Sequence, residues 1–89
     1  MQLVKGRVVM STAGRDRLTF QIVLEAAPDS ALVVDGKARP LQRPKRKNIK
    51  HLRLTSTVVP EEQMNTNREI RRALAYASGE GCAPQEEAI

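Results

Sequence analysis

The sequence predicts a mainly β fold: a small five-stranded antiparallel barrel, then one short C-terminal α-helix and a flexible tail. The 89 residues are enough for one small domain with a single core. Short runs of alternating apolar residues, typical of strands, fill residues 1–57. Farther along, apolar residues recur at intervals of three and four, which is the spacing of a helix.

The expected strands are short and joined by tight turns. They cover residues 3–11, 18–27, 31–34, 37–42 and 51–55. The turn after the first strand is centred on Gly14. Asp35 and Gly36 predict a two-residue hairpin, because both central positions can adopt positive φ. Pro44 places the return strand at a sheet edge or ends it there. Such strands suit a strongly curved barrel better than a flat sheet with long open edges.

Phe20, Ile22 and Leu24 are expected to lie on one face of the second strand, and Phe20 is expected to belong to the core. After a connector over 58–65, Thr66 and Glu69 form a capping box that begins a helix over 66–78. The apolar stripe of this helix is expected to pack on the barrel or on a partner. The stripe consists of Ile70, Ala73, Leu74 and Ala77.

Beyond the helix, residues 79–89 are expected to form a disordered acidic tail. On the far side of the helix lie three arginines that are expected to be a solvated face rather than a second RNA contact. They are Arg68, Arg71 and Arg72.

Charge is divided unevenly along the chain. The protein has 15 Lys and Arg against 10 Asp and Glu, a net charge of +5. Residues 1–54 hold twelve basic and four acidic residues, whereas residues 55–89 hold three basic and six acidic residues. Between Arg39 and Arg53 there are seven basic residues and no acidic one. Such an excess favours polyanionic partners, although a charge run is also typical of a solvated surface. Leu41 and Leu52 are among the apolar residues within the run, and they favour a folded surface over a disordered one.

Composition also excludes several kinds of site. Phe20 and Tyr76 are the only aromatic residues, too few for a module that stacks successive bases on exposed rings. A single cysteine, Cys82, indicates a reducing compartment. The sequence has no apolar run as long as a membrane span and no signal-peptide pattern, so a cytoplasmic protein without a membrane partner is expected.

The only histidine, His51, has no Cys, Asp or Glu at ligand spacing nearby. It is expected to pack or hydrogen-bond beside the last strand, or else to contact RNA. We therefore predict a protein that is not an enzyme, with no catalytic residue, no metal and no cofactor.

Two blocks of sequence resemble a known family. Lys5-Gly6-Arg7-Val8-Val9 followed by Thr12-Ala13-Gly14-Arg15-Asp16 is similar to the KOW motif. Val33-Val34-Asp35-Gly36 and then Arg46-Lys47-Asn48-Ile49-Lys50-His51-Leu52 resemble the fourteen-e type of large-subunit ribosomal protein. The resemblance implies an SH3-like (KOW-type) barrel that binds ribosomal or other structured RNA in translation, with ribosomal proteins as further partners. Leu18 stands where the KOW loop commonly has another glycine, and a leucine is not expected to adopt positive φ.

The candidate RNA-binding residues are cations that would bind phosphates and recognise RNA shape, with little reading of sequence. The stronger candidates are Arg43, Lys45, Arg46, Lys47 and Lys50. The weaker ones are Arg15, Arg17, His51 and Arg53. One alternative is an SH3-like protein-interaction module that docks an acidic partner, with Ile70, Leu74 and Ala77 as part of the partner site. Another is binding to an anionic membrane, which the absence of a strongly apolar amphipathic helix disfavours.

Overall fold

The computed structural model describes residues 2–15 and 17–77. It is mainly β, with one C-terminal α-helix, as predicted. The elements, in chain order, are β1 (Arg7–Ser11), β2 (Phe20–Ala26), β3 (Ser30–Val34), β4 (Lys45–Asn48), the 3₁₀ turn η1 (Ile49–His51), β5 (Leu52–Val58), the 3₁₀ turn η2 (Glu61–Gln63) and α1 (Asn67–Ala77). The predicted acidic tail at 79–89, including Cys82, lies outside the described residues.

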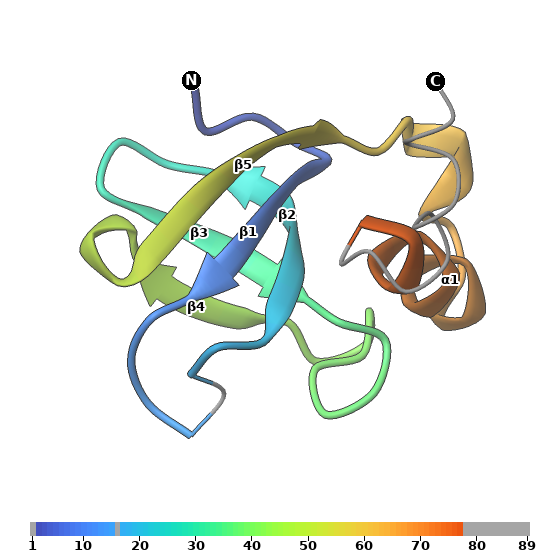
Figure 1. Ribbon diagram of the computed structural model, residues 1–89, viewed down its shortest axis with the longest axis horizontal. Coiled ribbons are helices and arrows are strands. Elements are labelled where there is room, and N and C mark those ends of the chain that lie inside the picture. Colours follow the sequence, from blue (N-terminus) through green and yellow to red (C-terminus); the bar gives the residue numbers. More distant parts are fainter. Residues whose placement is uncertain (1, 16, 78–89) are drawn as a thin grey trace.

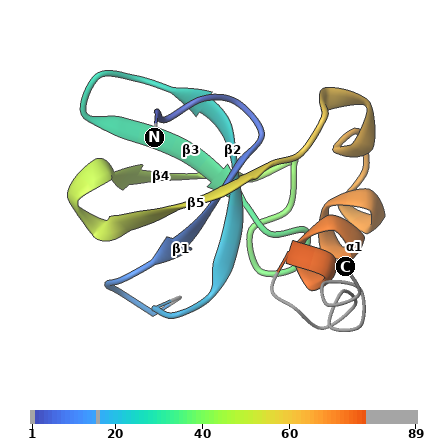
Figure 2. The ribbon, with the colours of Figure 1, turned by 45° about the horizontal axis from the view of Figure 1, so that its top comes forward.

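All five strands form one antiparallel sheet in the order β4-β3-β2-β1-β5. The sheet is strongly twisted, and α1 lies at one side of it (Figures 1 and 2). β4 and β5 follow one another in the chain through η1, yet they form the two edges of the sheet. Backbone pairing therefore does not close the sheet into the predicted barrel.

The predicted return strand at 37–42 is wrong. One carboxylate oxygen of Asp35, Oδ1, accepts hydrogen bonds from the backbone N–H groups of Lys37 and Arg39, both at 2.8 Å, so the chain turns again instead of pairing. The strand that pairs with β3 is β4, whose Lys45 lies opposite Val33. β4 begins directly after Pro44 and lies at an edge of the sheet.

Apolar side chains cover both faces of the sheet. The cluster on the helix side comprises Val8, Ile22, Val34, Val59, Met64, Ile70 and Leu74, with Phe20 and Leu24 packed against it. The cluster on the opposite face comprises Val9, Val23, Ala31, Val33 and Leu52. The shared face predicted for Phe20, Ile22 and Leu24 is thus confirmed. Burial of both faces fixes the strand register, because a one-residue slip would exchange the two sets.

The helix begins where its capping residues predict. The Thr66 hydroxyl oxygen accepts from the backbone N–H of Glu69 at 3.1 Å. The Glu69 carboxylate accepts from Asn65 N–H at 2.9 Å, one residue earlier than a capping box requires. Ile70 and Leu74 are buried against the sheet, so the apolar stripe packs on its own chain.

Polar contacts also join α1 to the loop between β3 and β4. Asn67 Oδ1 accepts from the backbone N–H of Leu41 at 2.7 Å, and Arg71 Nη1 donates to the carbonyl oxygen of Gly36 at 2.8 Å. Gly36 has a φ of +80°, and a Cβ atom there would lie 2.6 Å from the Asn67 carbonyl oxygen. Only glycine allows the helix to approach this turn so closely.

Candidate nucleic-acid interface

Exposed basic residues gather on the side of the sheet away from α1. They come from the β1–β2 loop, β4, η1 and the start of β5, which lie together in Figures 1 and 2. We call this surface the basic end; its exposed residues are Arg15, Arg17, Lys45, Arg46, Lys50, His51 and Arg53. Seven of the nine sequence-predicted contacts thus belong to one surface.

Backbone hydrogen bonds hold the β1–β2 loop beside η1. Thr12 N–H donates to the carbonyl oxygen of His51 at 2.9 Å. The loop closes on itself through Leu18 N–H, which donates to the Ser11 carbonyl oxygen at 2.7 Å. The start of the loop that carries Arg15 and Arg17 is therefore joined to η1, although some thirty-five residues separate the two regions in the chain.

Lys47 differs from the other candidates because its side chain is buried, with an exposed fraction of 7%. Its ammonium nitrogen donates to the carbonyl oxygen of Ala13 at 2.9 Å. The Ser11 hydroxyl donates to the same oxygen at 3.0 Å. Lys47 thus links β4 to the β1–β2 loop, and its charge is not displayed for a phosphate.

Lys45 and Arg46 occupy the exposed edge of the sheet. Because side chains alternate along a strand, they project to opposite faces of β4, and a phosphate backbone that contacts both must follow the edge. Arg46 Nη1 donates to the Ser30 hydroxyl at 2.8 Å. Charges on an edge strand also prevent pairing with another sheet, so β4 has a structural reason to be basic as well.

Arg43 and His51 are exposed, but they lie in different surroundings. Arg43 belongs to the loop before β4, which packs against α1, so it extends the basic surface towards the helix. His51 is part of η1, and its carbonyl oxygen makes the bond to Thr12. Because His51 is exposed, its packing or hydrogen bonding beside the last strand and its contact with RNA both stay predictions.

Among the described residues, no ion pair involves a cation of the basic end. The ion pair that these residues do form is Lys5 with Glu61, at 2.9 Å. Asp29 contacts η1 through its backbone, because its carbonyl oxygen accepts from Ile49 N–H at 3.0 Å. The cations of the basic end therefore remain available for a polyanion.

Two features of this region could not be seen in the sequence. Leu18 has a φ of +69°, so the expectation that leucine would avoid positive φ is wrong, and 67% of its surface is exposed. A hollow of about 470 Å³ lies beside it, between the β1–β2 loop, the turn after β3 and α1. The residue type at position 18 does not indicate a positive φ, although the glycine common at this position of the KOW loop is compatible with one, and the hollow depends on how the loop closes.

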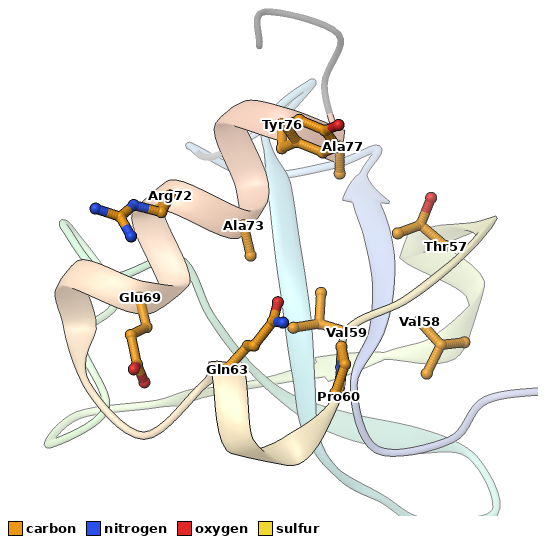
Figure 3. Close-up of a pocket in the computed structure, with 10 residues that line it drawn as sticks. All are labelled: Thr57, Val58, Val59, Pro60, Gln63, Glu69, Arg72, Ala73, Tyr76 and Ala77. Atoms are coloured by element: carbon orange, nitrogen blue, oxygen red, sulfur yellow. The ribbon is translucent and has the colours of Figure 1, made fainter. Parts of the chain in front are cut away.

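A second groove, of about 770 Å³, lies between α1 and the chain segment that leaves β5. Figure 3 shows Ala73 of the helix directed towards Gln63 and Val59, whereas Arg72 points away from them. Tyr76 and Val58 are 56% and 46% exposed. The groove thus lies on one flank of the helix, whereas the hollow lies on another and also borders the β1–β2 loop of the basic end.

Among residues 2–15 and 17–77 there is no group of three or more His, Cys, Asp or Glu side chains placed to hold a metal ion. In the same ranges no helix has the length and apolar character needed to cross a membrane. No family model and no curated protein matches the sequence in comparisons with known proteins. The role of the basic end therefore rests on its geometry and charge.

Proposed function

We propose that the protein is a non-catalytic RNA-binding protein that contacts ribosomal or other structured RNA through the phosphates. The observation that carries the proposal is the basic end, where two separate chain segments, the β1–β2 loop and the stretch from β4 to the start of β5, carry exposed cations. Lysine and arginine bind phosphates without access to base edges, which suits folded or double-stranded RNA. The cytoplasm is the proposed compartment, and ribosomal proteins are the proposed neighbours.

A KOW-type, SH3-like barrel is the proposed fold family. Support comes from the antiparallel order, in which β5 returns beside β1, and from η1 between β4 and β5. The residues that resemble the KOW motif span β1 and the loop that carries Arg15 and Arg17. In this proposal Lys47 positions that loop, while the exposed cations bind RNA.

One observation weighs against the alternative function, a docking module for an acidic protein. Ile70 and Leu74, two of the three helix residues assigned to the partner site, are buried in the chain's own core. The exposed arginines of the basic end would still attract an acidic protein. A pull-down with and without ribonuclease separates the two functions, because protein partners are lost on digestion only if RNA bridges them.

A direct test uses a labelled ribosomal RNA fragment and the Lys45→Ala, Arg46→Ala double variant. We expect the variant to bind every RNA more weakly than the unaltered protein does. The loss of affinity should be about the same whatever the RNA sequence, because phosphate contacts carry no sequence information. Circular dichroism should show an intact fold, since both side chains are exposed. Unchanged affinity, or a loss confined to one RNA sequence, would contradict the proposal.

A further inference from the structure

Leu18 occupies a conformation and a position that both disfavour a leucine. Its φ of +69° lies in the left-handed region, where the Cβ atom is crowded, and its side chain is 67% exposed to water. Glycine at this position would remove the steric cost and the exposed apolar surface together. A strained, exposed apolar residue where a basic loop closes is therefore a reason to look for a ligand that it contacts.

The hollow beside Leu18 is lined by both apolar and charged side chains, which we call its floor and its rim. Its lining includes Phe20 and Leu74, which belong to the helix-side core, and the cations Lys37 and Arg71. Arg71 is held at the rim by its 2.8 Å bond to the Gly36 carbonyl oxygen. Among the described residues of the lining, the acidic one is Asp35, which already accepts two backbone N–H groups through Oδ1.

The hollow lies between two basic segments. On one side is the β1–β2 loop with Arg15 and Arg17, and on the other is the turn that carries the exposed Lys37. An RNA backbone that runs from one segment to the other crosses the hollow. A base that is unpaired at this point can leave its stack and cover the apolar floor, while its phosphates stay near the rim cations.

We propose that this hollow takes one unpaired base of the RNA, with Leu18 as its apolar wall. The inference rests on the proposed RNA-binding function and deepens it, because it predicts a preference for a bulged helix over an uninterrupted one. A base flanked by phosphates matches an apolar floor within a cationic rim. Because Phe20 is only partly exposed, the contact depends on apolar packing more than on ring stacking.

The test compares two labelled RNA hairpins that share one stem, one of them with a single-nucleotide bulge, at a fixed salt concentration. We expect the protein to bind the bulged hairpin about fivefold more tightly, from partial burial of the Leu18 side chain. Leu18→Ala should abolish this preference and leave the affinity for the uninterrupted stem unchanged. Val58→Ala, which shortens an exposed apolar residue on the other flank of α1, should retain it.

Leu18→Gly separates binding from folding, because the two effects have opposite signs. This variant should melt about 4–8 °C higher, since the left-handed strain is relieved. It should also lose the preference for the bulge, which a simple loss of fold cannot explain.

Equal binding of both hairpins by the unaltered protein would overturn this inference and leave the proposed function standing. A Leu18→Ala variant that weakens both hairpins equally would also overturn it. Failure to bind either hairpin at low salt would overturn the proposed function and the inference with it.

Discussion

Lys47 Nζ donates to the carbonyl oxygen of Ala13 at 2.9 Å and so connects the edge strand β4 to the β1–β2 loop. Its neighbour Lys45, two residues earlier in the same strand, is exposed. The same residue type therefore has two roles within one strand. Lys47 positions the loop that carries Arg15 and Arg17, and Lys45 is available to a ligand.

These roles predict opposite effects of two alanine substitutions. Lys47→Ala should lower the free energy of unfolding by about 1–3 kcal/mol, because a buried hydrogen bond to a charged group is lost. Lys45→Ala should change it by less than about 0.5 kcal/mol, as is usual at an exposed site. Urea denaturation measures both values.

For RNA binding, Lys45→Ala should have the larger direct effect of the two variants. Lys45→Ala should reduce the salt dependence of binding by about one phosphate contact, whereas folded Lys47→Ala should cause no further reduction in a protein that already carries Arg15→Ala and Arg17→Ala. Equal stability losses for the two variants, or the loss of a further contact with Lys47→Ala in that background, would contradict the assignment.

A second prediction tests whether RNA affinity depends on where the arginines lie or only on the net charge of the protein. The Arg15→Ala, Arg17→Ala pair should weaken RNA binding and lower the salt slope by about two contacts, because both side chains belong to the basic end. The matched control is Arg68→Ala, Arg72→Ala, which removes the same charge from exposed positions on α1. Binding titrations that show equal losses for the two pairs would mean that net charge alone governs affinity.

A third prediction concerns the contact between α1 and the β3–β4 loop. Gly36→Ala should destabilise the protein by about 2–4 kcal/mol, through left-handed strain and overlap with the helix backbone. Ala38→Ser, at an exposed position of the same turn, is the control and should have little effect. Hydrogen exchange should show the loss of protection first in α1. Stability unchanged by Gly36→Ala would rule out the close approach.

The elements that could be predicted are those whose signal is local. Alternation over 18–27 and the Thr66 cap indicated β2 and the start of α1, and the structure has both. The strand expected at 37–42 failed because the Asp35 side chain captures two backbone N–H groups and α1 contacts the chain beyond them. Neither contact can be read from alternation.

The sequence predicted which residue types form the candidate site but not how these residues are arranged. The run from Arg39 to Arg53 indicated a basic surface, but its members look alike in the sequence. Burial of Lys47 depends on Ala13, which lies thirty-four residues away in the chain. The positive φ of Leu18 likewise follows from loop closure, through its bond to Ser11.

Salt dependence of binding to structured ribosomal RNA tests the central claim most directly. About five phosphate contacts predict that the logarithm of the binding constant falls with the logarithm of salt concentration at a slope of about −4, because bound cations release counterions. A slope near zero, or no binding at low salt, would contradict the claim that the basic end binds RNA phosphates.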